Sequence, residues 1–459
     1  MARLRGLPVI SNPAQFVVVA FGTLILIGTL LLALPFAVDD SVGLGWEDSL
    51  FMSTSASTVT GLATVDVAVF STFGELVLLA LIQVGGFGIM TIGSVLALVL
   101  ARRVGLRQRM LARAEIGAVH IGELSSLLWA IARITLIVEG LLATVLFVKF
   151  WRSGYEDDVG SALYSAIFHA VSTFNNAGIS LYSDGLTRFV GDPVVVVVVS
   201  FGFIIGGLGF PVLLEVFRRA RLSTATASRS AAHTTRWSIH TKVTLAATGG
   251  LLIVGPILVL LFEWRNPGTL GPLGVSDSLL AGWFQGVTPR TAGFNTVDIA
   301  QMHEPTQFVT TVLMFIGAGP ASTSGGIKVT TFAVLGFVLW SEVRGDRDVN
   351  ALGRRLPSTV VRQAVTVALL SIATVVGMSL LLMASDELTL TTALFEASSA
   401  FGTVGLSTGV TGNISTFGHL MLVLVMLAGR VGPVTFVTAL ALRDRSRAFR
   451  YPEERPIIG

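Results

Sequence analysis

The sequence has 459 residues, of which 52% are hydrophobic and only 13% are charged. A soluble globular protein has about 25% charged residues, so this composition excludes that class. The sequence contains no cysteine, which excludes disulfides, thiolate metal ligands and cysteine nucleophiles. The net charge is only +3 and the basic residues are dispersed among loops, so we expect no nucleic-acid partner. Long apolar runs instead predict an all-α polytopic protein embedded in a lipid bilayer.

Eight apolar runs are long enough to cross about 30 Å of hydrocarbon at about 1.5 Å per helical residue. They lie at residues 14–36, 73–100, 125–150, 194–217, 243–263, 306–340, 359–384 and 416–442. Acidic residues gather in loops after the odd-numbered runs, whereas most of the 31 basic residues lie at the N-terminus, after even-numbered runs and in the tail. Because basic loops stay in the cytoplasm, we expect both termini there, with the protein in the plasma (inner) membrane.

A short polar segment separates each outgoing run from its returning run. These segments are Trp46–Ser57, Val159–Phe174, Asp277–Thr288 and Leu388–Phe401. A glycine follows each segment, and an aromatic residue of the segment lies ten positions before that glycine. These aromatic residues are Phe51, Phe168, Trp283 and Phe395. A hydroxyl residue lies five or six positions before that glycine, namely Ser55, Ser172, Thr288 and Ser399.

The glycines themselves end four short stretches that we call the glycine segments. The first is Thr58, Val59, Thr60 and Gly61; the second Asn175, Asn176, Ala177 and Gly178; the third Arg290, Thr291, Ala292 and Gly293; the fourth Gly402, Thr403, Val404 and Gly405. A near-constant period in matching context is typical of internal duplication. We predict four repeats at 1–113, 114–236, 237–355 and 356–442, followed by a cytoplasmic tail at 443–459.

The predicted repeat is a helix, a re-entrant pore helix, a glycine segment and a returning helix. Non-helical backbone at membrane depth is stable only when it is buried in protein or lines a water-filled cavity. Four such segments around one central pore would present carbonyl oxygens that replace the hydration shell of a monovalent cation. No carboxylate lies in the segments, which argues against a divalent-cation site. The alternative interpretation is four external loops with turn glycines.

The sixth apolar run is interrupted by Gly317–Lys328, which we call the interrupting loop. The residues that make it a candidate gate beneath the glycine segments are Gly317, Gly319, Ser322, Thr323, Ser324, Gly325, Gly326 and Lys328. A discontinuous helix at membrane depth often lines a permeation pathway, although a static kink is the alternative. Arg430 is also at membrane depth, and we predict an electrostatic barrier that hydrogen-bonds the loop, with an architectural tether as the alternative. Lys328 could instead extend toward the cytoplasm.

The four glycine segments, the interrupting loop and Gly429–Arg430 resemble the Trk/Ktr/HKT superfamily of potassium transporters over nearly the whole chain. The first run begins near residue 14, which is more similar to KtrB-type than to TrkH-type membrane subunits. The resemblance implies a homodimer with one pore per subunit, a potassium filter at the glycine segments and a nucleotide-binding cytoplasmic regulatory subunit of the RCK type (KtrA/TrkA-like). It also implies stimulation by sodium in some relatives. Pro320 and Ala321 replace small flexible residues of the relatives, which reduces the expected mobility of the loop.

The leading functional hypothesis is potassium uptake through a gated pore. The alternative is a secondary transporter that moves a small solute by alternating access, but that mechanism predicts two interrupted helices in an inverted pair. An enzyme is not expected, because the six histidines are scattered and show no metal-ligand or nucleophile spacing. No organic cofactor is predicted for this chain.

Overall fold

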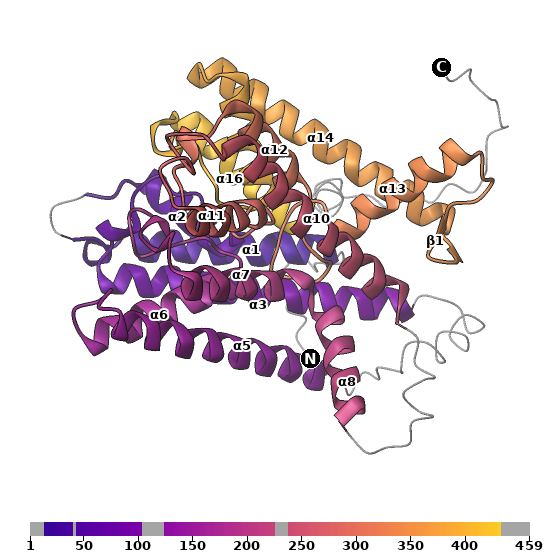
Figure 1. The fold of residues 1–459 in the computed structure, drawn as a ribbon, viewed down its shortest axis with the longest axis horizontal. Helices are drawn as coiled ribbons and strands as arrows, with labels where there is room; N and C mark the ends of the chain where they lie inside the picture. Colours follow the sequence, from indigo (N-terminus) through magenta and orange to yellow (C-terminus); the bar gives the residue numbers. More distant parts are fainter. Residues whose placement is uncertain (1–12, 40–42, 103–123, 225–236, 433–459) are drawn as a thin grey trace, which may run out of the picture.

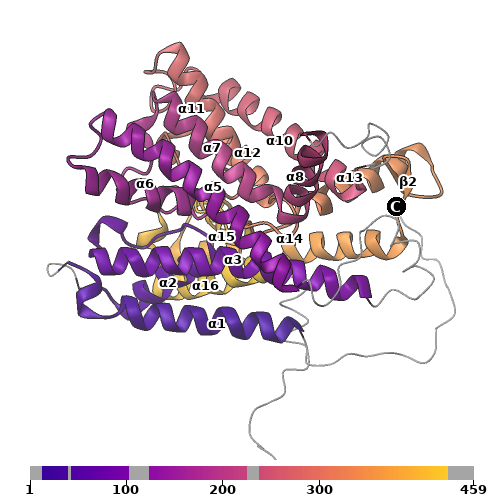
Figure 2. The same cartoon turned by 90° about the horizontal axis from the view of Figure 1, so that it is seen from below.

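The computed structural model describes residues 13–39, 43–102, 124–224 and 237–432. The chain in these ranges is mostly helical, and its long helices run roughly side by side (Figures 1 and 2). Two short strands, β1 (Asn350–Ala351) and β2 (Arg354–Arg355), form an antiparallel hairpin at one end of the molecule (Figure 1). Both predicted cytoplasmic termini and the tail at 443–459 lie outside the described residues.

Four long apolar helices correspond to the first, third, fifth and seventh predicted runs. They are α1 (Pro13–Leu32), α5 (Leu124–Arg152), α10 (Ile239–Glu263) and α14 (Ser358–Asp386). Each contains a stretch of at least 18 residues with a mean hydropathy between 2.1 and 2.4, of which no more than 33% is buried inside the chain. A helix that exposes so much apolar surface is suited to contact with lipid.

Two of the four returning runs are each divided between two helices. The helices of the four runs are α3 (Thr72–Arg102), the bent pair α7 (Pro193–Leu208) and α8 (Phe210–Thr224), the pair α12 (Glu304–Phe315) and α13 (Val329–Arg344), and α16 (Thr416–Val431). Each of the eight predicted runs contains at least one helix. Among the described residues, four helices meet the length and hydropathy of a span, or five if the bent pair counts as one.

The run predicted at 194–217 is not one helix. It bends by 104° between α7 and α8, at Gly209, which has φ +91° and ψ 141°. Only glycine adopts this backbone conformation readily, and a side chain at Gly209 would also overlap the carbonyl oxygen of Pro320 in the interrupting loop. The sequence predicts the interruption at Gly317–Lys328 in the third repeat, whereas this break in the second repeat was not predicted. Gly432, where α16 ends, has a closely similar φ of 94° and ψ of 137°.

Four short helices match the predicted polar segments. They are α2 (Trp46–Thr58), α6 (Val159–Phe174), α11 (Val275–Val287) and α15 (Leu390–Gly402). Each packs against the preceding long helix, α1, α5, α10 and α14 in turn. Short 3-10 turns follow them at η2 (Val67–Val69), η4 (Thr187–Phe189), η5 (Ile299–Gln301) and η6 (Thr411–Asn413), and η1 (Pro35–Ala37) follows α1.

Each short helix completely buries at least one aromatic side chain, and these include Phe51, Phe168, Phe284 and Phe395. Phe51, Phe168 and Phe395 lie ten positions before a glycine, whereas the residue at that position in the third helix, Trp283, is only partly buried. The cause is the turn after α11. There the amide of Ala292 donates to the Thr288 carbonyl, four residues back, whereas Thr60 donates to Ser55, five residues back. The third helix is therefore shifted by one residue relative to its glycine.

A glycine in three returning helices permits close contact with a short helix. A methyl group added at Gly85, Gly206 or Gly429 would overlap the carbonyl oxygen of Ser57, Phe174 or Phe401, respectively. We expect Gly206→Ala to lower the free energy of unfolding by about 1–3 kcal/mol, because packed backbone must move. Thermal unfolding of the purified protein in detergent measures the effect.

The matched control for that substitution is Gly377→Ala in α14. An added methyl group at Gly377 would have no neighbour within 4 Å, so this variant should be neutral or more stable by up to about 1 kcal/mol. Equal unfolding temperatures for the two alanine variants would contradict the packing role of Gly206.

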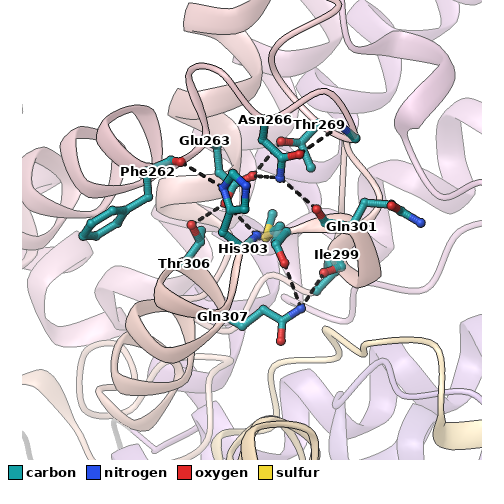
Figure 3. A network of polar contacts seen from close by, with 11 residues as sticks. Phe262, Glu263, Asn266, Thr269, Ile299, Gln301, His303, Thr306 and Gln307 are labelled. Atoms are coloured by element: carbon teal, nitrogen blue, oxygen red, sulfur yellow. Dashed lines mark hydrogen bonds and ion pairs between the residues drawn. The ribbon is translucent and has the colours of Figure 1, made fainter.

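The Glu263 carboxylate joins the C-terminal end of α10 to the start of α12 (Figure 3). Its two oxygens accept hydrogen bonds from Asn266 Nδ2 and Thr269 Oγ1, both at 2.6 Å, from the His303 amide at 3.0 Å, and from Thr306 Oγ1. Only 1% of the Glu263 surface is exposed. A buried carboxylate with this many donors is satisfied without a basic partner.

We expect Glu263→Ala to destabilise the fold by about 2–4 kcal/mol, because buried donors lose their acceptor. The midpoint of thermal unfolding should fall by several degrees. Glu304→Ala is the control, since Glu304 is an exposed residue in the first turn of the same helix α12. An unchanged midpoint in Glu263→Ala would show that the network does not fasten α10 to α12.

Candidate functional site

The four glycine segments come together in a closed cycle. A side chain added at any of the four glycines would overlap a backbone carbonyl oxygen of another segment. That oxygen belongs to the residue just before the other segment's own glycine. The pairs are Gly61 with Ala177, Gly178 with Ala292, Gly293 with Val404, and Gly405 with Thr60. Each segment thus contacts the next one in chain order, and the fourth contacts the first. Backbone oxygen atoms gather at one point in the molecule.

The residue two positions before each glycine has a left-handed backbone. The φ values are 54° at Val59, 60° at Asn176, 69° at Thr291 and 50° at Thr403. For β-branched residues such a conformation costs about 1–3 kcal/mol, and it persists only where surrounding structure enforces it. All four residues are fully buried or nearly so. Sequence reasoning missed this feature, because only asparagine among these residue types tolerates the left-handed region.

The predicted hydroxyl residues fasten the glycine segments to the short helices, but in two ways. Ser55 and Ser399 accept hydrogen bonds from the amides of Gly61 and Gly405, at 3.0 and 3.1 Å. Ser172 and Thr288 instead donate to the carbonyl oxygens of Ile179 and Phe294, at 2.7 and 2.6 Å. The first and fourth segments are therefore anchored through an amide, and the second and third through a carbonyl group just beyond the glycine.

Two side chains of the predicted filter are directed away from the other segments. Arg290 is buried and donates to the Thr248 carbonyl of α10 at 3.2 Å, so its charge lies toward that helix. Asn175 donates to Gln83 of α3 and Glu139 of α5. Neither of these two side chains therefore faces the other segments, whereas the Asn176 side chain reaches the interrupting loop.

Contacts of α2 with α16 join the first part of the chain to the last. The Glu47 carboxylate lies 2.7 Å from His419 Nδ1 and accepts a hydrogen bond from Thr416 Oγ1 at 2.8 Å. The hydrogen bond with His419 is the main reason that the pKa of Glu47 is lowered from its ordinary value. The other nitrogen of His419 lies 2.7 Å from the carbonyl oxygen of Thr411. This polar contact closes the cycle of helices on one side.

The interrupting loop docks against the break in the second returning helix. The Gly319 amide donates to the Gly207 carbonyl at 2.8 Å, and the Phe210 amide donates to the Ala321 carbonyl at 3.1 Å. Ala321 itself has a left-handed φ of 53°. Backbone groups that lack a helical partner in one interruption thus form hydrogen bonds with those of the other. These bonds satisfy the polar backbone groups in a region without regular helix. This contact could not be predicted from the sequence.

The same loop contacts two glycine segments. Thr323 Oγ1 donates to Asn176 Oδ1 of the second segment at 3.0 Å. A side chain at Gly325 would overlap Thr403 of the fourth segment. Gly317 closes the base of the loop, where its amide donates to the Ile327 carbonyl at 2.8 Å.

Other loop residues are held within the loop itself. Ser322 Oγ donates to the Gly319 carbonyl at 2.6 Å, whereas Ser324 Oγ is buried without a partner. The ammonium group of Lys328 donates to the carbonyl oxygens of Ser324 and Gly325. Lys328 therefore turns back onto the loop rather than extending away from it.

Arg430 connects the loop to two further helices. One terminal nitrogen of its guanidinium group donates to the Thr323 carbonyl, and the other donates to the Gly85 carbonyl of α3 at 3.1 Å. Only 2% of Arg430 is exposed, and its Nε has no hydrogen-bond partner. No carboxylate pairs with this arginine in the part of the chain that the structure describes. A buried positive charge therefore lies next to the interrupting loop and α3.

Comparison with known proteins identifies the family. The family model described as TrkH, a cation transport protein, matches residues 7–450. The chain belongs to the TrkH family. The Ktr system potassium uptake protein B of Bacillus subtilis (strain 168) is 38% identical over 98% of this chain and 97% of its own length. The potassium/sodium uptake protein NtpJ of Enterococcus hirae is 32% identical over 98% and 97%.

A solved structure supports the same fold. The potassium transporter TrkH from Vibrio parahaemolyticus aligns with 95% of this chain and 85% of its own, with a TM-score of 0.70 and 20% sequence identity. At this identity the likeness shows the TrkH fold alone. Members of the TrkH family are transport proteins, and the chain is not an enzyme.

Proposed function

We propose that this chain is the ion-translocating membrane subunit of a Ktr/Trk-type potassium uptake system. Its TrkH-family membership and its similarity to potassium uptake proteins of comparable length support this function. The observation that carries the proposal furthest is the closed cycle of glycines and carbonyl oxygens. A cation at that position would meet only neutral backbone dipoles, which suits a monovalent ion that sheds its water.

The proposed pore would conduct potassium without co-transport of a counter-ion. Uptake of one potassium ion gains about 2.3 kcal/mol for each 100 mV of membrane potential, negative inside. The rigid anchors at Ser55, Ser172, Thr288 and Ser399 would hold the carbonyl oxygens in place, so that a smaller ion could not draw them inward. Sodium would then be less well coordinated than potassium, although sodium could still stimulate transport from another site.

The interrupting loop is the proposed gate. Its contacts with Asn176 and with Thr403 would block passage below the glycine segments. Arg430, which donates to the loop, would add an electrostatic barrier to cations. Movement of the loop would require the loss of its hydrogen bonds with Gly207 and Phe210, so the break between α7 and α8 would move with it.

The assembly proposed for this system is a homodimer in the plasma membrane, with one pore in each subunit. Both termini would lie in the cytoplasm, as the distribution of basic residues predicts. A separate cytoplasmic subunit of the RCK type would bind nucleotide and control the interrupting loop. These features rest on the family resemblance and on the charge pattern.

Rubidium uptake tests the proposed function. The purified chain is reconstituted in liposomes loaded with KCl, and radioactive rubidium is added outside. We expect uptake that external KCl competes with and that equal NaCl does not, while protein-free liposomes take up none. Equal competition by sodium, or no uptake even with a regulatory subunit supplied, would contradict the potassium assignment.

A further inference from the structure

An isolated acidic residue lies at the centre of a membrane helix. Glu139 is near the middle of the 29-residue helix α5, about 20 Å from either end at about 1.5 Å per residue. Only 6% of its surface is exposed. Helices α3 and α6 contact α5, and the three lie close together in both views (Figures 1 and 2). The carboxyl group therefore lies where an unpaired charge is costly.

Two amide side chains contact this carboxyl group. Gln83 Nε2 donates to Glu139 Oε2 at 3.3 Å, and Asn175 Nδ2 donates to Glu139 Oε1 at 3.1 Å. Asn175 Nδ2 is also 2.8 Å from Gln83 Oε1 and 3.0 Å from the Val171 carbonyl oxygen. This nitrogen carries two hydrogens but faces three acceptors. The cluster of Glu139, Gln83 and Asn175 is therefore one hydrogen short.

The oxygen atom of the Asn175 amide has the opposite deficiency, because it lacks a donor. Asn175 Oδ1 is fully buried and has no hydrogen-bond partner. A buried polar atom without a partner costs about 1–3 kcal/mol. A proton on Glu139 would give the cluster the missing donor, because a protonated carboxyl group can donate to Gln83 Oε1. Asn175 Nδ2 would then be free to serve its remaining acceptors.

No basic residue compensates the charge of Glu139 among the described residues. On α5, Lys149 forms an ion pair with Asp192 at 2.8 Å, and Arg133 lies six residues away along the same helix. On α3, Glu75 accepts from Tyr164 of α6 at 2.7 Å. Among the remaining neighbours, α7 carries no titratable side chain.

Two further titratable groups, one on α6 and one that reaches α3, are engaged elsewhere. On α6, His169 contacts the Ser165 carbonyl at 2.7 Å and Ser180 Oγ at 3.0 Å. On α16, Arg430 reaches Gly85 on α3, two residues from Gln83. An ionised Glu139 would thus remain in an apolar environment with two amide donors alone, which favours the neutral acid.

We propose that Glu139 is a proton-binding site within the membrane whose protonation state alters the second glycine segment through Asn175. Asn176, the next residue, accepts from Thr323 of the interrupting loop, so a shift of Asn175 reaches both the glycine segment and the loop. The proton binds from water to one carboxyl oxygen and returns to water, with no other reactant. The coupling to transport rests on the proposed function, whereas the proton site does not.

Infrared spectroscopy tests the site independently of transport. The purified protein is titrated in detergent, and the carbonyl stretching band of protonated carboxylic acids is followed. We expect a band that disappears as pH rises in the wild-type protein and that is missing in Glu139→Gln. Glu75→Gln, which removes a half-buried carboxyl group of α3 outside the cluster, should keep this band. An identical titration in wild type and Glu139→Gln would overturn the proposal.

Transport measurements test the coupling. We expect rubidium uptake by the wild-type protein to change about tenfold across the titration, which corresponds to about 1.4 kcal/mol. Glu139→Gln resembles the neutral acid, so its uptake should stay at the acidic limit at every pH. A pH profile of Glu139→Gln that matches the wild type would overturn the coupling. Titration of the infrared band by sodium or potassium at constant pH would overturn the proton assignment in favour of a metal-ion site.

A second variant keeps the test decisive if Glu139→Gln does not fold. Gln83→Leu removes the donor to Glu139 Oε2, and a lost hydrogen bond to the ionised form favours the neutral acid. The midpoint of the infrared titration should then move to higher pH by about one unit. An unchanged midpoint would overturn the proposal.

Discussion

Gly178→Ala should reduce rubidium uptake by at least about a hundredfold, which corresponds to about 2.7 kcal/mol of added barrier. The new methyl carbon would lie 2.5 Å from the Cα atom of Gly293 and 2.8 Å from the Ala292 carbonyl oxygen, at a backbone φ of +65°. Neither neighbour is a flexible side chain. The third glycine segment must therefore move, and its carbonyl oxygens would leave the position that a potassium ion needs. Uptake into liposomes, with protein content measured for each preparation, gives the effect.

Gly409→Ala is the control that separates the effect of steric overlap from the effect of a strained backbone. Gly409 has a φ of +88°, but an added methyl group would have no neighbour within 4 Å. This variant should lose about 1–2 kcal/mol of stability from the strained backbone and retain most of its uptake. Wild-type transport by Gly178→Ala would contradict the proposed filter. Equal losses in both variants would attribute the effect to strain rather than to the ring.

Arg430→Ala should raise rubidium uptake about tenfold when no regulatory subunit is present. The substitution removes the hydrogen bond to Thr323 that holds the interrupting loop. It also removes a positive charge, and two unit charges about 8 Å apart interact by about 2 kcal/mol at an effective dielectric constant near 20. The two effects act in the same direction, toward a loop that opens and a pore that cations enter more readily. Uptake by the chain alone is the measurement.

Arg430→Lys distinguishes the barrier from the tether. Lysine keeps the positive charge but cannot bridge two carbonyl groups with a planar fork. If charge provides most of the barrier, Arg430→Lys should stay near the wild-type rate, and if the tether does, it should approach the alanine variant. Arg188→Ala is the control, since that arginine pairs with Asp184 at 2.8 Å, outside the glycine segments and the loop. Unchanged or lower uptake by folded Arg430→Ala would reject the gate.

Much of the helical fold could be predicted from the sequence, because its signals are local. Apolar runs locate α1, α5, α10 and α14 to within a few residues. The polar segment at Val159–Phe174 coincides with α6, since Asp158 caps its first turn and an apolar face follows. The repeated glycines identify the segments that meet, because only glycine allows backbones to approach so closely.

Features that depend on tertiary contacts could not be predicted in this way. The bend at Gly209 packs against the carbonyl oxygen of Pro320, which is over a hundred positions later in the sequence. The left-handed backbone at Val59 goes against the preference of its residue type. The burial of Phe284 rather than Trp283 follows from the turn after α11, which is one residue shorter than the corresponding turn after α2. Each outcome is set by a partner that local patterns do not reveal.

Anomalous diffraction from crystals grown in rubidium chloride tests the shared ion site most directly. We predict a rubidium peak enclosed by the four glycine segments, within coordination distance of the carbonyl oxygens of residues 60, 177, 292 and 404, and its loss when rubidium is exchanged for sodium. Rubidium bound only elsewhere in the protein would contradict a potassium filter built from these four segments.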